Sequence, residues 1–389
     1  MRRPLLLAAL TLSVASAAAC SSTDTTPATP APADAAPPPE PQPAQDAAPV
    51  DAGDPACAAE ATAIQAGLDA EVARQKVQHA TIGIETPRCG VRVFFGRGAG
   101  ATAAVTEDSL WRIGSVTKTF VSAVILALAA DGKLGLDDAV EGYVPGYPNA
   151  PAMTVRQLLD HTSGAYNYTE ATAFADALRD APLTVRTPAD LLAFASAQAP
   201  TFAPGADWSY SNTNYVMLGL VAEKAGGKPI AELIRSLATS KVGLTHTFLD
   251  GAETVTGDLV PGTQSGVDVT RAFHPSVAWA AGAIVSTPKE LLTWIHALYG
   301  TDRVLSAASK KELFTFVPKS GYGLGVSQIP AGATLGNGAG VGHGGSIFGY
   351  QTQAFWFEQT KTGLVAIVAD TGGNPNALSL VALKAIEKK

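Results

Sequence analysis

Cysteine, methionine and long hydrophobic runs are all scarce in this sequence. It has 3 cysteines and 3 methionines in 389 residues, with no H-E-x-x-H stretch and no Cys/His set spaced like metal ligands. Beyond the first 20 residues no segment reaches about 18 uninterrupted apolar residues, the length of a membrane-spanning helix. The G-x-S-x-G pattern of α/β-hydrolases is also missing. We therefore expect no metal site, no organic cofactor and no membrane-spanning helix.

Basic residues are in the minority. The chain has 27 Lys and Arg against 34 Asp and Glu, a net charge of −7. Arg2 and Arg3 are the basic residues before position 21, and residues 21–56 hold 6 of the acidic residues and no basic one. The 333 residues that follow therefore carry 25 basic and 28 acidic residues. That long part is nearly neutral and has no basic stripe suited to phosphate backbones, so we expect no nucleic-acid partner. Its length suits two packed lobes.

The first 19 residues are predicted to be a signal peptide. Arg2 and Arg3 form a positive start, an apolar stretch follows over 5–19, and small residues precede Cys20. The stretch ends in A-A-A-C, which resembles a bacterial lipobox, whose cysteine is acylated and tethers the protein to a membrane. Ala17 stands where a lipobox usually has Leu, so ordinary signal-peptide cleavage is the alternative. Both interpretations predict an exported protein of the periplasm or cell envelope, and the first predicts a lipoprotein.

A spacer is predicted over residues 20–56. Residues 21–56 contain 10 Pro and 10 Ala among 36 residues and no aromatic side chain, so little there can offset the entropy of ordering. Two cysteines remain, Cys57 and Cys89. In an exported chain such a pair is most simply a disulfide, which here would join the first helix to an early strand. A reactive thiol is the competing interpretation, but no His or Asn lies in a setting typical of cysteine hydrolases.

The folded domain is predicted over 57–389, with strands at both ends and helices between. Residues 58–78 have apolar side chains at four-residue spacing, and 115–131 are apolar on almost every side, as in a fully buried helix. Strands are expected at 81–85, 91–96, 323–327, 351–357 and 364–369, and further helices at 155–159, 188–198, 215–225, 230–237, 288–298 and 378–388. This order predicts an α/β (α+β) fold, in which an antiparallel sheet flanked by helices (about 57–125 and 311–389) carries an inserted, mainly helical lobe (about 126–310).

Ser115 and Lys118 form the sharpest local signal, in the stretch G-S-V-T-K where a loop becomes a helix. Positions i and i+3 share one helix face, so the amine can reach the hydroxyl and take its proton. The helix N-terminus adds N–H groups and a positive potential that favour a developing anion. Chance occurrence and helix capping are the alternatives. The apolar helix favours chemistry, because a lysine at its edge needs a partner or a lowered pKa.

Tyr210 and Asn212 form a second candidate pair, in the stretch W-S-Y-S-N before a predicted helix. In an extended backbone both side chains point to the same side. A phenol near an ammonium can act as a base, and an asparagine can hold both a lysine and a substrate amide. The alternative is helix capping, since Ser and Asn are frequent at helix starts.

His343, Gly345 and Ser346 lie in a third, glycine-rich stretch, G-V-G-H-G-G-S over 340–346. It matches G-x-G-x-x-G, but no strand is expected before it and a strand follows, so a dinucleotide site is not predicted. Glycines at a strand edge permit close approach of a substrate backbone. His343 can supply a positive or proton-shuttling group there, although a single His is more often structural. His161, in H-T-S-G, is interpreted as a structural residue near the site.

Taken in order, S-x-x-K at Ser115, Y-x-N at Tyr210 and H-x-G at His343 resemble the three motifs of the penicillin-recognising serine enzymes. Within these, the sequence is similar to the class C β-lactamase-like group, serine peptidase family S12. It is most similar to the D-alanyl-D-alanine carboxypeptidase branch, in which His replaces the Lys of the third motif. The similarity extends over residues 58–385, with supporting segments at 132–138, 154–164, 210–214, 321–325 and 342–350.

The resemblance implies hydrolysis of a small peptide, ester or β-lactam through an acyl-enzyme. Ser115 would be the nucleophile, and Lys118 and Tyr210 would manage the proton, with the identity of the base left open. Backbone N–H groups of Ser115 and Ser346 would form the oxyanion hole. The residues that would contact the substrate or its oxyanion are Asn212, His343, Gly345 and Ser346.

Two departures from the family pattern concern specificity. Gly344 stands where the carboxypeptidases usually have Thr, and Val326-Ser327 stand where they have an Arg that grips the substrate carboxylate. The expected activity is a D-alanyl-D-alanine carboxypeptidase on cell-wall peptides. An esterase or class C-type β-lactamase on the same scaffold is the nearest alternative, and a non-turnover penicillin-binding sensor is another. Lys118 and Tyr210 argue against the sensor, since a pure binder needs no proton-transfer groups.

Overall fold

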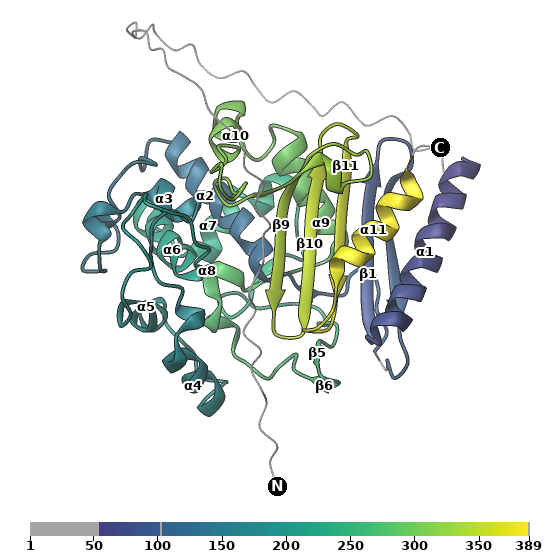
Figure 1. The fold of residues 1–389 in the computed structure, drawn as a ribbon, viewed down its shortest axis with the longest axis horizontal. Coiled ribbons are helices and arrows are strands. Elements are labelled where there is room, and N and C mark those ends of the chain that lie inside the picture. The colour runs from purple at the N-terminus through teal and green to yellow at the C-terminus, as the bar shows by residue number, and fades with distance from the viewer. Residues whose placement is uncertain (1–53, 102, 388–389) are drawn as a thin grey trace, which may run out of the picture.

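Figure 1 shows the computed structural model, which describes residues 54–101 and 103–387. The predicted signal peptide, Cys20 and all but the last residues of the predicted spacer lie outside these ranges. In the described part, an antiparallel sheet stands beside a helical lobe (Figure 1), which confirms the predicted fold class.

The main sheet is built from both ends of the folded chain, as the sequence predicts. Its six strands run in the order β2-β1-β11-β10-β9-β8, and every neighbouring pair is antiparallel. The strands are β1 (His79–Thr86), β2 (Gly90–Arg97), β8 (Ser327–Ile329), β9 (Gly340–Ile347), β10 (Tyr350–Phe357) and β11 (Thr362–Val368).

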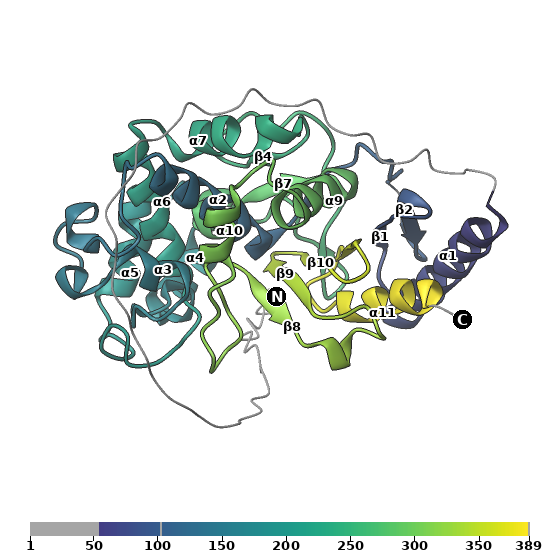
Figure 2. The same ribbon diagram turned by 90° about the horizontal axis from the view of Figure 1, so that it is seen from above.

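Helices cover both faces of this sheet. On one face lie α1 (Pro55–Gln75) and α11 (Pro375–Ile386), whose apolar side chains, among them Ile64 and Leu378, are buried against the strands. On the other face lies α9 (Pro288–Ile295), as Figure 2 shows from above. The central strands β1 and β11 are therefore largely buried on both faces.

The helical lobe is organised around α2 (Thr117–Ala130). This helix is buried on nearly all sides, as its apolar sequence predicts, and it packs against the rest of the lobe and against β9. The other lobe helices are α3 (Val155–Leu159), α4 (Thr172–Asp180), α5 (Pro188–Ser196), α6 (Asn212–Gly226), α7 (Ile230–Leu237), α8 (Trp279–Gly282) and α10 (Ala307–Leu313). The sequence did not predict α4, α8 and α10.

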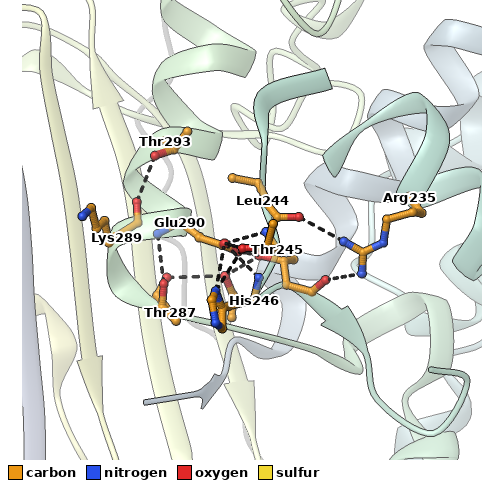
Figure 3. Close-up of polar contacts among 10 residues, drawn as sticks. Arg235, Leu244, Thr245, His246, Thr287, Lys289, Glu290 and Thr293 are labelled. Carbon is orange, nitrogen blue, oxygen red and sulfur yellow. Dashed lines mark hydrogen bonds and ion pairs between the residues drawn. The ribbon is translucent and has the colours of Figure 1, made fainter. Parts of the chain in front are cut away.

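A second sheet, of three short strands, was not predicted either. Its order is β3 (Trp111–Arg112), β7 (Ile284–Ser286) and β4 (Phe248–Leu249), and strands of two or three residues are too short to show a period. Figure 3 shows how the segment before β4 is held: the Glu290 carboxylate accepts hydrogen bonds from the backbone N–H groups of Thr245 (2.7 Å) and His246 (2.8 Å). The Arg235 guanidinium donates to the Leu244 carbonyl at 3.0 Å.

Two strand predictions near the C-terminal end need correction. The strand expected at 323–327 is a turn that leads into β8 at Ser327, because Gly325 has a φ of 85° and lies against Ser122, where a Cβ would collide. The stretch 340–347 was not predicted as a strand, because four of its eight residues are glycine, yet it forms β9. Pairing with β10 on one side and β8 on the other supplies what its propensity lacks.

Cys57 in α1 and Cys89 in the β1–β2 turn are joined by a disulfide, the pairing that the sequence predicted. Beside it, the Glu60 carboxylate forms ion pairs with Arg88 and Arg92. Among the described residues, no helix combines the length and the hydrophobicity that crossing a lipid bilayer demands.

Candidate active site

Ser115 lies between β3, a strand of the second sheet, and the start of α2. The chain leaves β3, donates a hydrogen bond from Ile113 N to Ile284 O (3.1 Å), and turns through Gly114 into a 3₁₀ turn, Gly114–Val116. Gly114 has a φ of 52°, and a Cβ on it would lie 2.7 Å from the backbone nitrogen of Ser346. Only glycine fits there, because the backbone conformation is left-handed and β9 approaches so closely.

Lys118 is completely buried beside Ser115. Its Nζ lies 3.0 Å from Ser115 Oγ, 2.8 Å from Asn212 Oδ1 and 2.6 Å from the Ala281 carbonyl oxygen. Burial lowers the pKa of Lys118 well below its ordinary range. A neutral amine has two N–H groups, which the Asn212 and Ala281 oxygens accept, and one lone pair, which is then directed to the Ser115 hydroxyl.

Tyr210 lies against the lysine. Its ring centroid is 4.9 Å from Lys118 Nζ, and the residue is half-buried, with its hydroxyl oxygen withdrawn from solvent. Burial raises the pKa of Tyr210 far above its ordinary value, and the neighbouring Ser115 hydroxyl opposes this only in part. The phenol therefore keeps its proton at neutral pH.

Asn212 is the first residue of α6, not part of the extended stretch that the sequence predicted. It nevertheless contacts Lys118, and its Nδ2 donates to Thr169 Oγ1 at 3.3 Å. Its backbone N–H donates to Asn167 Oδ1 at 3.0 Å. Asn212 is thus fixed between the lysine and the 3₁₀ turn Tyr168–Glu170, which carries Thr169.

Gly345 and Ser346 lie on β9, directly against the turn that carries Ser115. A Cβ on Gly345 would collide with the carbonyl oxygen of Ile113, and it would lie 3.1 Å from the backbone nitrogen of Ser115. The backbone nitrogens of Ser115 and Ser346 therefore come from two segments in close contact. β8 pairs with β9 only at 340–342, so Gly345 and Ser346 lie on the part of β9 that is not paired with β8.

His343 is also on β9, and it is 4% exposed. Its Nε2 lies 2.7 Å from the Tyr322 hydroxyl, and its Nδ1 contacts the Gly344 carbonyl oxygen. The carbonyl can only accept, so Nδ1 carries the proton and Nε2 accepts from Tyr322. Burial and the nearby Lys118 lower the pKa of His343 to about 3. The ring is thus neutral at ordinary pH, whereas the sequence had left open a positive group.

The structure brings the three predicted motifs together around Ser115 and adds contacts that the sequence analysis missed. Ala281 acts through a backbone carbonyl, which leaves no signal in a sequence. Tyr322 lies in G-Y-G-L-G, a segment that supports the family resemblance but to which the sequence assigns no function. Within residues 54–101 and 103–387, no three His, Cys, Asp or Glu side chains gather as a metal site would require.

Residues 70–386 match the protein family described as Beta-lactamase. Among solved structures, the chain is similar to a D-stereospecific amidohydrolase from Streptomyces sp., with a TM-score of 0.73 and 31% identity over 82% of this chain and 96% of that one. It is also similar to the D-amino acid amidase from Ochrobactrum anthropi SV3, complexed with D-phenylalanine, with a TM-score of 0.74 and 26% identity over 85% and 99% of the two chains.

Among curated proteins, the chain is similar to esterase EstB of Burkholderia gladioli, with 34% identity over 163 residues, which are 38% of this chain and 40% of that protein. The chain spans about half or less of the length of the curated relatives that it matches.

Proposed function

Because the chain belongs to the Beta-lactamase family, whose members are serine hydrolases, we propose that it is an exported D-stereospecific amidohydrolase. It acts through an acyl-enzyme at Ser115. The D-configuration follows two similar solved structures, those of a D-stereospecific amidohydrolase and a D-amino acid amidase.

Acylation begins when Lys118, as a neutral amine, takes the proton of the Ser115 hydroxyl. Ser115 Oγ then attacks the amide carbon, and the N–H groups of Ser115 and Ser346 hold the oxyanion, each worth about 3 kcal/mol. Tyr210 donates its O–H proton to the leaving nitrogen and regains a proton from Lys118. A water molecule hydrolyses the acyl-enzyme by the same groups in reverse.

The observation that carries the preference for amides is the state of His343. Its ring is buried and neutral, and both nitrogens are already bonded to Tyr322 and Gly344. A substrate with a terminal carboxylate needs a cation near its leaving group, and the Arg of the carboxypeptidases is replaced here by Val326-Ser327. Amides without a carboxylate suit this site better than acyl-D-alanyl-D-alanine peptides or β-lactams. The carboxypeptidase stays a prediction from the resemblance.

A second candidate is an esterase, which the 34% identity to EstB favours. The alcohol or phenol released from a simple ester also carries no carboxylate, so the neutral His343 does not distinguish an ester from an amide. The two activities differ in what the leaving group demands, because an amine must be protonated as it departs and an activated phenolate need not be.

The test compares four substrates and a fluorescent penicillin with the full chain and its Ser115→Ala variant. The substrates are D-phenylalanine amide, L-phenylalanine amide, an N-acyl-D-alanyl-D-alanine and p-nitrophenyl acetate. We expect kcat/KM for the D-amide to exceed that for the L-amide and for the dipeptide by at least about tenfold, and Ser115→Ala to abolish all turnover. Faster release of D-alanine from the dipeptide would select the carboxypeptidase. Ester cleavage alone would select the esterase, and stable labelling by a fluorescent penicillin without turnover would select the sensor.

We further propose that the protein is exported and anchored by a lipid at Cys20. Support comes from the basic start, the apolar stretch over 5–19 and the A-A-A-C end of the segment. The full chain is expected to fractionate with membranes and to take up labelled palmitate, and Cys20→Ala is expected to lose both. A Cys20→Ala protein that still pellets with membranes would rule out this anchor.

A further inference from the structure

His161, which the sequence predicts to be a structural residue near the site, lies directly against Tyr210. It follows α3, and it is completely buried. Its φ is 65°, a conformation that residues other than glycine adopt at a cost of about 1 kcal/mol or more. Such a conformation persists only where the surrounding structure stabilises it, so the contacts of His161 indicate what holds it there.

Those contacts bracket Tyr210. The His161 carbonyl accepts a hydrogen bond from the backbone N–H of Ser209 at 3.1 Å. Its ring Nδ1 accepts one from the backbone N–H of Ser211 at 3.2 Å. The residues on both sides of Tyr210 are therefore fixed to one residue, and the His161 ring itself lies 4.4 Å from the Tyr210 ring, centroid to centroid.

The ring can serve as an acceptor only while Nδ1 is unprotonated. Asn214 Nδ2 is a second donor to it at 3.1 Å, and this amide is oriented by Ser163, whose hydroxyl donates to Asn214 Oδ1 at 2.7 Å. Burial, together with Lys118 on α2 and His343 on β9, lowers the pKa of His161 well below its ordinary range. The other titratable side chains whose rings face it are Tyr210, Tyr215 and Tyr322.

We propose that His161 is a positioning residue that sets the Tyr210 side chain against Ser115 and Lys118. The inference rests on the proposed acyl-enzyme chemistry, since it concerns the proton transfer that Tyr210 carries out there. A displacement of Tyr210 by about 1 Å is enough to lower the rate about a hundredfold. His161 acts on that distance and does not touch the reacting atoms.

The test is a double-mutant cycle with the full chain, measured as the rate of Ser115 acylation by D-phenylalanine amide in a single turnover, because its leaving amine needs the proton that Tyr210 donates. His161→Phe keeps a ring beside Tyr210 but removes the acceptor. His161→Asn keeps an acceptor and tolerates the positive φ, but it removes the ring. Each is made alone and together with Tyr210→Phe. Ser163→Ala is the matched control, because it loosens Asn214 without touching the Ser211 contact.

We expect His161→Phe to lower the acylation rate about tenfold to a hundredfold, and His161→Asn to lower it less, by about threefold to tenfold. In the Tyr210→Phe background both changes should cost no more than about twofold, because the group they position is already gone. Ser163→Ala should have a small effect that is equal in the two backgrounds.

Losses that are equal with and without the Tyr210 hydroxyl would overturn the proposal, because they would show a merely structural role. A wild-type rate for His161→Phe would overturn it as well. If His161→Phe does not fold, the His161→Asn cycle decides: equal losses, or none, contradict positioning. A wild-type chain that never acylates Ser115 overturns both this inference and the proposed function, whereas an active wild type with additive losses overturns this inference alone.

Discussion

At the scale of single residues, Lys118 shows how burial becomes reactivity. Solvent would keep this amine charged, but the apolar helix α2 removes it from water and leaves only neutral partners, the Ser115 hydroxyl and two carbonyl oxygens. No carboxylate is among the hydrogen-bond partners of Lys118 in the described residues, so nothing there restores the charged form. Burial thereby shifts Lys118 toward its neutral form, which can accept a proton.

This geometry makes a prediction about pH. The neutral amine is the active form, so kcat/KM should rise with pH through the pKa of Lys118. Because that pKa is lowered by burial, the rise should occur well below the pH at which an exposed lysine titrates. Lys118→Arg keeps a cation that cannot lose its proton, and we expect acylation to fall by about 10²-fold to 10⁴-fold. Stopped-flow acylation by p-nitrophenyl acetate across pH measures both effects.

Thermal melting checks that the Lys118→Arg variant is folded. A Lys118→Arg protein with more than about a tenth of the wild-type rate would show that another group is the base.

The stability of the fold should also rise with pH. Between the pKa of Lys118 in the folded chain and its higher pKa in the unfolded chain, the unfolded chain binds more protons at this residue. The contribution of Lys118 to the free energy of unfolding should therefore increase as pH rises.

At the scale of elements, β9 carries Gly345 and Ser346 against the Ser115 turn, and the sequence pattern does not predict it as a strand. Its glycines lower its strand propensity, yet they are what allows it to lie against the Ser115 turn. Two of the helices were easier to predict, because α2 is apolar over several turns and α7 has an apolar face, and both lie near the predicted positions. The residues of the site could be predicted because the three motifs are recognised by residue type and spacing in the sequence, before the helices and strands are known. The Ala281 carbonyl and the bracketing of Tyr210 could not be, because backbone contacts depend on the fold.

Two adjacent glycines of β9 provide a matched pair of variants. A Cβ on Gly345 would collide with the Ile113 carbonyl, whereas a Cβ on Gly344 meets its nearest atom, the Thr352 carbonyl oxygen, at an ordinary 3.8 Å. Gly345→Ala should push β9 away from Ser115 and lower the acylation rate by about a hundredfold, because the oxyanion donor on Ser346 moves with the strand. Gly344→Ala should remain within about threefold of the wild-type rate. Equal rates for the two variants would contradict the contact between β9 and the Ser115 turn.

At the scale of the whole molecule, the two ends of the folded chain depend on each other. β1 pairs with β11, and α1 packs beside α11, so the first and last elements share one core. The candidate site lies between this sheet and the lobe inserted into it, with Ser115 and Lys118 at the start of α2, Tyr210 before α6 and His343 on β9. The edge strand β2 is separated from β9 by β1, β11 and β10, so a local loss of order at β2 should have little effect on the site.

The Cys57–Cys89 disulfide tests this separation. It joins α1 to the β1–β2 turn across 32 residues, at the edge of the sheet farthest from β9. A loop of that length confers about 3–4 kcal/mol on the folded state in the chain-entropy model. The Cys57→Ala/Cys89→Ala double variant should therefore unfold at a lower denaturant concentration, with a loss of that size in the free energy of unfolding, while its acylation rate at low temperature stays close to wild type. Chemical denaturation of the oxidised protein, the reduced protein and the double variant measures the loss, and a large fall in the acylation rate of the folded variant would show that the sheet edge and the site are coupled.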